Sequence, residues 1–70
     1  MNYIKKTRPK YDEYYYHIGT HGHVYDKKWY NDVLDVNYYK IGNCYRTIEE
    51  AKANSDKWIA FYASDEVLEV

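Results

Sequence analysis

The chain has 70 residues, enough for one domain in which only about 60% of the unfolded surface can be buried. Its formal charge of −1 argues against the broad positive field of a duplex-DNA binder. Its single cysteine cannot form an internal disulfide, so we expect a cytoplasmic protein, and no run nears the roughly 18 apolar residues of a membrane span. Eleven residues are tyrosine, and because tyrosine joins a rigid ring to a hydroxyl that tolerates water, this composition favours a binding protein.

Residues 1–10 are predicted to form a basic N-terminal arm. Four Lys and Arg residues give this segment a charge of +4. Pro9 keeps Arg8 out of helical geometry, so the arm is expected to be extended. Residues 11–70 are predicted to form a single small α+β domain.

An aromatic β-hairpin is predicted at the start of this domain. Residues 14–18 favour a strand, residues 19–22 form a turn cluster, and residues 24–29 form the returning strand. An even loop length would place Tyr16 on one face with Tyr25, whereas a three-residue loop would exchange the faces of the second strand. In either register both faces carry tyrosine, so we expect a helix to cover one face and the other to stay free.

The middle of the chain is predicted to be irregular, followed by a short third strand. Residues 31–37 alternate polar and apolar side chains with Asn and Asp at turn positions, which indicates a loop or a single helical turn. Tyr39, Ile41 and Tyr45 then suggest a strand that a bulge or turn at Gly42–Asn43 interrupts.

A helix is predicted from about Ile48. Thr47 and Glu50 have the spacing of a capping box, in which each side chain accepts from the backbone of the other. An apolar stripe follows at spacings of three and four and includes Ile48, Ala51, Ser55, Trp58, Ile59 and Tyr62. The helix is expected to end between Ala63 and Glu69. The predicted fold is therefore a small antiparallel sheet of two or three strands packed against one C-terminal helix.

The titratable residues do not form a recognisable catalytic or metal-binding pattern. His17, His21 and His23 lie close together, but a structural zinc site needs a second pair of ligands, so we interpret them as turn and surface residues. Cys44 lacks the surroundings of a nucleophile and is expected to pack as a free thiol. The sequence therefore predicts no enzyme, no cofactor and no metal.

Three segments resemble small uncharacterised proteins encoded by phages and prophages of Firmicutes. They are the Ile18–Val24 turn, the Trp29–Asp35 segment and residues 39–51, in which Gly42–Asn43 is followed by an aromatic residue, a threonine and Glu-Glu-Ala. The resemblance covers roughly residues 14–58 and is most specific over residues 42–51. It implies a mobile-element origin and, since many small phage proteins bind a host immunity protein such as a CRISPR effector, an anti-defence role.

We therefore expect a non-catalytic, phage-derived inhibitor that binds a host protein through a tyrosine-rich surface. The predicted contacts are seven aromatic residues and two carboxylates that could pair with basic groups of the target, namely Tyr14, Tyr15, Tyr16, Trp29, Tyr30, Tyr38, Tyr39, Asp32 and Asp35. The alternative is a single-stranded nucleic-acid-binding module in which bases stack on Tyr and Trp while Lys contacts phosphate, although nearby carboxylates oppose it. Self-association is a further use of such a surface.

Overall fold

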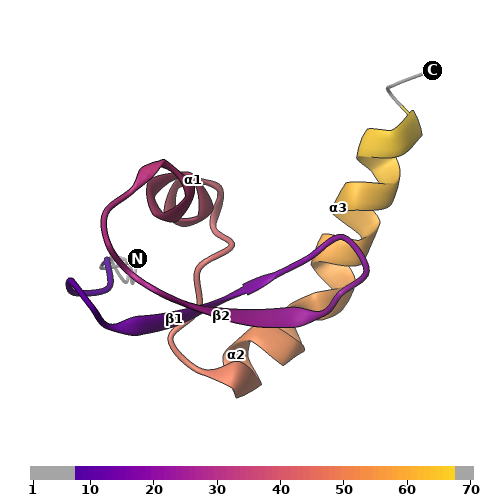
Figure 1. Ribbon diagram of the computed structural model, residues 1–70. Helices are drawn as coiled ribbons and strands as arrows, with labels where there is room; N and C mark the ends of the chain where they lie inside the picture. Colours follow the sequence, from indigo (N-terminus) through magenta and orange to yellow (C-terminus); the bar gives the residue numbers. More distant parts are fainter. Residues whose placement is uncertain (1–7, 68–70) are drawn as a thin grey trace, which may run out of the picture.

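The computed structural model of the protein describes residues 8–67 and places a two-stranded antiparallel sheet among three helices (Figure 1). In chain order the elements are β1 (Tyr14–Ile18), β2 (Val24–Lys28), α1 (Val33–Ile41), α2 (Ile48–Ala53) and α3 (Ser55–Val67). The predicted α+β class is thus confirmed, with two strands. Most of the predicted basic arm, residues 1–7, lies outside the described residues. At its described end Pro9 is buried and the Arg8 guanidinium lies 5.1 Å from the centre of the Tyr39 ring.

The hairpin loop has five residues, because Ile18 is paired with Val24. Gly22 adopts a φ of +85°, the left-handed region that glycine enters without strain. An odd loop length gives the second of the two predicted registers. Residues 14, 16 and 18 therefore share one face with residues 24, 26 and 28, while residues 15 and 17 share the other with residues 25 and 27.

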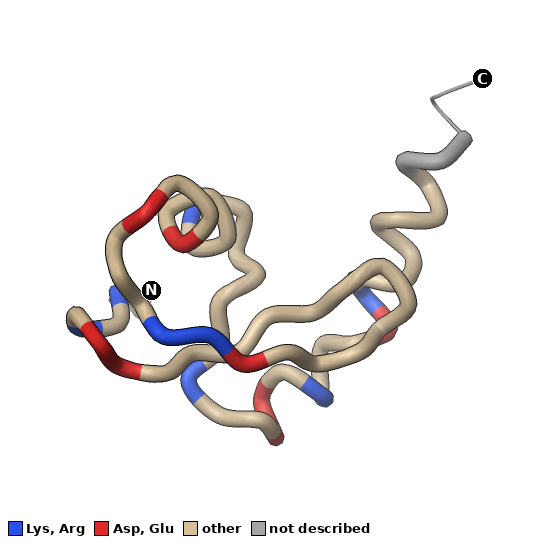
Figure 2. The backbone as a smooth tube through the Cα atoms, in the orientation of Figure 1, with Lys and Arg blue, Asp and Glu red and all other residues tan. Residues whose placement is uncertain are grey.

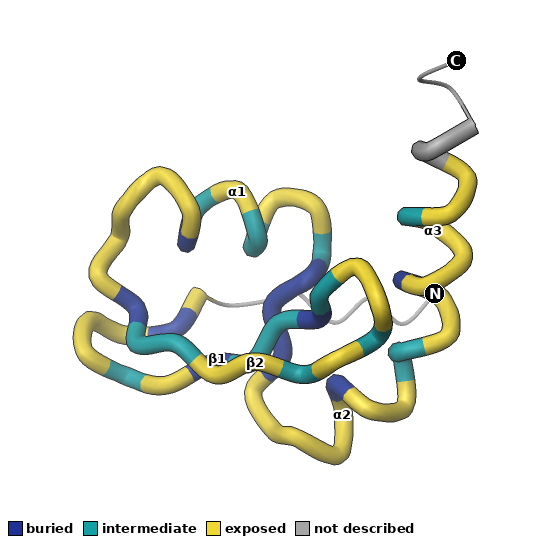
Figure 3. The backbone as a smooth tube through the Cα atoms, turned by 45° about the vertical axis from the view of Figure 1, so that its right-hand side comes forward, coloured by how far each residue is buried: buried dark blue, intermediate teal, exposed yellow. Residues whose placement is uncertain are grey.

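One face of the hairpin packs against the C-terminal helices. Ile18 forms a buried cluster there with Tyr45, Ala51 of α2 and Trp58 of α3. The Trp58 indole donates to the Tyr45 hydroxyl at 2.9 Å, so the polar edge of the buried ring is satisfied. In Figure 3 the buried residues follow the middle of the molecule, and most of α1 and α3 is exposed.

The other face of the hairpin is covered in part by α1, so the prediction that one sheet face stays free is wrong around Tyr15 and Trp29. Tyr15, Trp29 and Cys44 form a second buried cluster, against which partly buried residues of α1 pack. Those residues are Val36, Tyr38 and Tyr39. A two-stranded sheet is too narrow to hide large rings by itself, and this second layer supplies the burial that Tyr15 and Trp29 require.

The helix α1 replaces the loop and the third strand that the sequence predicted. Asp32 is its N-cap, and its carboxylate accepts from the Asp35 amide at 2.9 Å while Asp35 accepts from the Asp32 amide at 3.3 Å. Gly42 ends the helix with a φ of +86° and donates to the carbonyls of its last turn. Tyr39 is therefore helical, and of the predicted third strand only Tyr45 pairs with β1, through one bridge to Tyr16.

Asn43 completes the edge of β1 that a third strand would have covered. Its side-chain oxygen accepts from the Ile18 amide and its side-chain nitrogen donates to the Ile18 carbonyl, both at 2.8 Å. Asn43 is fully buried. The side-chain amide of Asn43 thus bonds to the two backbone groups of Ile18 that a neighbouring strand would otherwise satisfy.

The predicted C-terminal helix is present as two helices that meet at Asn54. Thr47 accepts from the Glu50 amide at 3.1 Å, as the capping box predicted, but the Glu50 carboxylate accepts from the Arg46 amide at 3.2 Å rather than from Thr47. Asn54 caps α2 and donates to the Glu50 carbonyl at 2.9 Å. The chain turns there into α3, which is helical up to Val67, the last described residue. The Ser55 hydroxyl then donates to the Gly22 carbonyl at 2.7 Å, which fixes α3 to the hairpin loop.

Candidate protein-binding surface

Three of the nine predicted contact residues lie in the interior. Tyr15 and Asp35 are fully buried and Trp29 is only 3% exposed. The prediction that they touch a partner is wrong for these three, because α1 packs over the face of the hairpin that carries Tyr15. They belong to the scaffold of the protein.

Asp35 is the centre of a buried polar network that joins α1 to the hairpin. One carboxylate oxygen accepts from the Tyr15 hydroxyl at 2.6 Å and from the Lys27 ammonium at 2.7 Å. The other accepts from the backbone amides of Tyr30 at 2.7 Å and Asp32 at 3.3 Å. Four donors leave this carboxylate little capacity to act as a base, so its role is structural.

The network shifts the pKa values of its members in the directions that its geometry requires. Burial alone would raise the pKa of Asp35, but the donors from Lys27, Tyr15 and the backbone outweigh it and hold that pKa well below the usual range. Burial and the hydrogen bond to Asp35 raise the pKa of Tyr15. Burial opposes the charge of Lys27, yet its bonds to Asp35 and Asp32 raise its pKa. Asp35 and Lys27 therefore stay charged at neutral pH.

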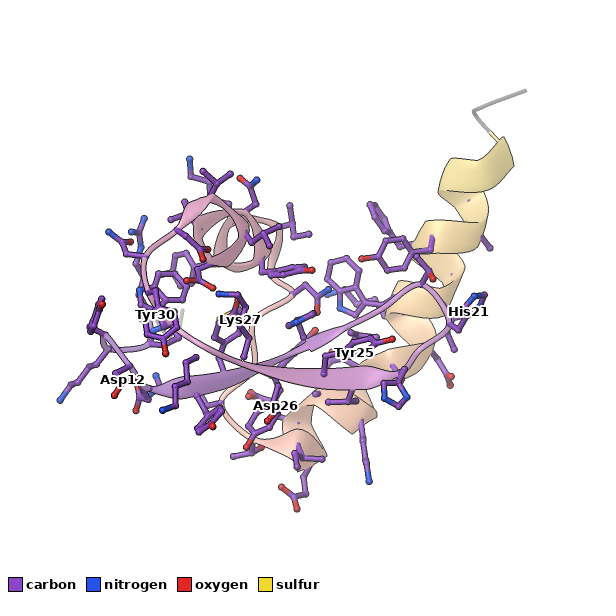
Figure 4. All side chains as sticks on the ribbon, in the orientation of Figure 1. Asp12, His21, Tyr25, Asp26, Lys27 and Tyr30 are labelled. Carbon is purple, nitrogen blue, oxygen red and sulfur yellow. The ribbon has the colours of Figure 1, made fainter. Side chains whose placement is uncertain are left out.

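An exposed group of rings lies where β1 begins and β2 ends, and we call Tyr11, Tyr14, Lys28 and Tyr30 the aromatic end. The Tyr11 and Tyr30 rings meet edge to face with their centres 5.5 Å apart, and Lys28 lies 5.3 Å from the centre of the Tyr14 ring. Tyr11 is 73% exposed, Tyr14 51% and Tyr30 46%. Figure 4 shows Tyr30 beside Asp12 at this end of the hairpin. These rings present apolar area to solvent while contacting one another.

Backbone hydrogen bonds hold the aromatic end in place. The Asp12 amide donates to the Trp29 carbonyl at 2.7 Å, and the Trp29 amide donates to the Glu13 carbonyl at 2.9 Å. The Lys10 amide donates to the Glu13 carboxylate at 2.7 Å. The segment that carries Tyr11 is thus tied to the hairpin, and its ring loses little freedom on contact with a partner.

The charges around the aromatic end are paired. Lys28 lies 3.5 Å from the Asp12 carboxylate, which raises the pKa of Lys28, and Arg46 lies 2.9 Å from Glu13. Figure 2 shows the basic pair of β2 directly next to an acidic position of the same strand. The local field is therefore mixed in sign, which suits a protein surface better than a phosphate backbone.

The other predicted contacts do not join the aromatic end. Tyr16 shares the face of Tyr14 but lies further along β1, where it is half-buried beside the C-terminal helices. Tyr38 and Tyr39 are half-buried in α1, where Tyr38 stacks on His17 and Tyr39 meets Trp29 edge to face. Asp32 is exposed, but it caps α1 and pairs with Lys27 at 3.2 Å. Of the nine, only Tyr14 and Tyr30 lie in the aromatic end.

Two further tyrosines, Tyr11 and Tyr25, are exposed although they are not among the predicted contacts. Tyr11 stands between Lys10 and Asp12, and a ring flanked by two charged residues is a signal of exposure that could have identified it. Tyr25 is 50% exposed near the hairpin loop, on the face that α1 covers only in part. Its exposure could not be predicted while the register and the position of α1 were unknown.

The histidines and the cysteine differ in their exposure. His21 and His23 are exposed, and Cys44 is a buried free thiol. Among residues 8–67 no three His, Cys, Asp or Glu side chains come together as a metal-binding group. Within the same part of the chain, no helix combines the length and apolar composition that crossing a membrane requires.

His17 makes the stability of the fold depend on pH. Its ring stacks between Tyr38 at 4.2 Å and Tyr25 at 5.6 Å, and burial, followed by nearby Lys27, lowers its pKa. The unfolded chain takes up this proton near pH 6.5, so stability falls as the pH drops below that value, by at most about 1.4 kcal/mol per pH unit. Replacing His17 by Phe is expected to remove this part of the slope in urea titrations between pH 7 and pH 5. His21 and His23 are present in both chains, so the difference between the two chains reports on His17 alone. If the variant kept the same dependence of stability on pH, His17 would not be its source.

Comparison of the chain with models of known protein families, with curated proteins and with solved structures found no match.

Proposed function

We propose that this protein is a non-catalytic inhibitor that binds a host protein through the aromatic end. The observation that carries the proposal is the exposure of Tyr11, Tyr14 and Tyr30 after both faces of the hairpin have been covered by helices. Folding alone does not need these rings on the surface. Exposed rings gathered at one end of a small domain are typical of a recognition surface.

The chemistry of the aromatic end suits a protein partner. A tyrosine ring adds a large contact area at small entropic expense, and its hydroxyl can hydrogen-bond at a wet rim. Contact between Tyr11 and Tyr30, together with Lys28 over Tyr14, orders the rings before binding. A partner that covers these rings gains buried area without first ordering them.

The proposed target class is a component of host immunity, such as a CRISPR effector, in the cytoplasm of the host cell. Its support is the resemblance of Gly42–Asn43 and the Thr47–Ala51 helix start to small phage-encoded proteins of Firmicutes. Such an inhibitor would act by covering a working surface of the target, and it would need no catalytic group. This assignment rests on analogy of sequence, whereas the binding surface rests on geometry.

Single-stranded nucleic acid is the alternative partner, and the ion pairs disfavour it. Lys27, Lys28 and Arg46 each lie within 4 Å of a carboxylate, so binding phosphate would require breaking those pairs. A labelled oligonucleotide is therefore expected not to bind at low salt. Binding that weakens steeply as salt is raised would favour this alternative instead.

The proposal predicts that Tyr11 and Tyr30 are required for inhibition. In a Firmicutes host that carries CRISPR immunity, expression of the chain is expected to restore the plating of a targeted phage. The double change Tyr11→Ser and Tyr30→Ser is expected to abolish this rescue, because loss of central rings typically weakens binding by over 2 kcal/mol, or about thirtyfold. Plating efficiency measures the effect.

The matched control is Tyr25→Ser, which removes a tyrosine of similar exposure near the hairpin loop. This variant is expected to keep the rescue, since Tyr25 lies away from the aromatic end (Figure 4). Circular dichroism checks that each variant is folded. Absence of rescue by the unchanged chain, or equal loss in the control, would contradict the proposal.

A further inference from the structure

The outer edge of β2 carries backbone groups that β1 does not use. In an antiparallel pair, residues alternate between those that bond across the pair and those that turn their amide and carbonyl outward. The cross-strand bonds at both ends of the hairpin, from Trp29 to Glu13 and from Gly19 to His23, set this alternation. It places the outward-facing groups of β2 on residues 24, 26 and 28.

The equivalent edge of β1 is closed, which makes the two edges of the sheet different. Tyr16 exchanges two backbone hydrogen bonds of 2.8 Å with Tyr45, and Asn43 satisfies the amide and carbonyl of Ile18. Within residues 8–67, β2 pairs with β1 alone. No proline interrupts β2. Of its outward-facing groups, the Lys28 carbonyl accepts from the Lys27 ammonium at 3.3 Å, and a carbonyl can accept a second bond. A strand edge left in this state is a template for another strand.

A hollow of about 610 Å³ lies beside this edge, between β2 and α2. Val24 and Ile48 give it apolar walls, while Asp26 and Lys52 contribute opposite charges. In Figure 4, Asp26 lies on the α2 side of β2 and Lys27 on the α1 side. Side chains of a strand added to β2 would alternate in the same way, so every second one would enter the hollow.

We propose that the outer edge of β2 binds an extended peptide strand of a partner protein. The strand hydrogen-bonds to the backbone of residues 24, 26 and 28, places an apolar side chain between Val24 and Ile48, and sets a Lys or Arg opposite Asp26. Backbone bonds provide affinity and the alternate side chains provide specificity, as in other cases of strand addition. The inference rests on the proposed function only in that the partner is a protein, and it assigns a second contact surface and a mode of binding.

The charge of Asp26 selects a foreign strand over a second copy of this chain. The symmetrical antiparallel register that uses all of β2 would place Asp26 directly opposite Asp26 of the second copy. Like charges in that position destabilise a strand pair. A register centred on Lys27 sets two ammonium groups opposite each other, and a register centred on Tyr25 avoids both repulsions but pairs only residues 24–26 of the strand. A strand with a basic residue opposite Asp26 meets neither repulsion.

The first test is selection of binders from a yeast-displayed library of random nine-residue peptides with the full 70-residue chain. Selected peptides are expected to alternate in polarity and to be enriched in Lys or Arg at one position. On binding, the amides of residues 24, 26 and 28 are expected to become slow in hydrogen exchange by NMR, whereas those of Tyr25 and Lys27 are already slow. New protection at every second amide of β2 is the signature of an added strand. Failure to select binders, or protection without this alternation, would overturn the proposal.

Charge reversal at Asp26 tests the specificity. Asp26→Lys is expected to weaken the selected peptides by about fivefold or more, and a new selection on this variant is expected to enrich Asp or Glu instead. The matched control is Asp56→Lys, which reverses an exposed aspartate on α3 and should leave affinity unchanged. Unchanged preference in the Asp26 variant, with its fold intact by circular dichroism, would overturn the assignment.

These measurements separate the two proposals. The peptide selection needs no host component, so its failure removes the edge site and leaves the aromatic end to be judged by phage plating. Conversely, loss of rescue on changing Tyr11 and Tyr30, with normal peptide binding by that variant, would show that the edge and the aromatic end act separately.

Discussion

Replacing Asp35 by alanine is expected to lower the free energy of unfolding by about 3–5 kcal/mol, the usual effect of removing one partner from a buried ion pair. The change leaves the buried Tyr15 hydroxyl and the Tyr30 amide without their acceptor, and it leaves the Lys27 ammonium with Asp32 as its only carboxylate partner among the described residues. Urea unfolding followed by tryptophan fluorescence measures the loss, because Trp29 lies in the adjoining cluster.

The control for this prediction is Asp32→Ala. Asp32 caps the same helix and contacts the same lysine, but it is exposed, so its removal is expected to cost only about 1 kcal/mol. If the two variants lost equal stability, the buried network would have no role beyond helix capping. The expectation is also met if the Asp35→Ala variant is already unfolded in buffer while the Asp32→Ala variant is folded.

Acid should reveal the same network in the unchanged protein. The folded state holds the pKa of Asp35 below that of an unfolded aspartate, which is about 3.9. The stabilisation is therefore fully present above that value and is lost as the pH falls below it. The Asp35→Asn variant has no carboxylate to protonate at this position. The difference in free energy of unfolding between the unchanged chain and this variant is therefore expected to narrow in acid. A gap that stays constant down to pH 2 would contradict the assignment.

Replacing Asn43 by aspartate is expected to cost about 2–4 kcal/mol although the side chain keeps its shape. The new carboxylate can still accept from the Ile18 amide, but it no longer donates to the Ile18 carbonyl and instead faces it with negative charge. Asn43 is fully buried, so water cannot replace the lost donor. Thermal unfolding by circular dichroism measures the change.

The matched control is Asn54→Asp. Asn54 also donates its side-chain amide to a backbone carbonyl, but at an exposed helix end where water can take the place of the donor. Its change is expected to cost well under 1 kcal/mol. Equal losses at the two positions would show that the hydrogen bonds of Asn43 do not hold the edge of β1.

Local signals in the sequence predicted the hairpin and the C-terminal helix start, and the same signals were missed at α1. Thr47 and Glu50 predict a helix start. Asp32 and Asp35 have the same spacing, but Asn and Asp also favour turns, so the sequence around them indicates a loop. Gly42 was interpreted as a bulge, although it ends a helix. A cap is ambiguous when the segment after it lacks a clear apolar stripe, and α1 is such a segment.

Burial was harder to predict than secondary structure. Tyr14, Tyr15 and Tyr16 are consecutive, yet the first is half-exposed, the second is fully buried and the third is partly buried. Alternation along a strand separates the neighbours into two faces, but only the position of α1 determines that Tyr15 is enclosed. The candidate surface therefore depends on the position of α1, a helix that the local signals of the sequence do not reveal.

Four residues of segment 42–51, the most specific part of the proposed resemblance to phage proteins, build this fold. Gly42 ends α1, Asn43 binds the backbone of β1, Thr47 begins α2, and Ala51 lies fully buried under the hairpin. None of them belongs to the aromatic end. The framework and the outward side chains can thus change independently, so chains that share this pattern would keep one architecture while diverging in what they recognise, as antibody loops do on a common framework.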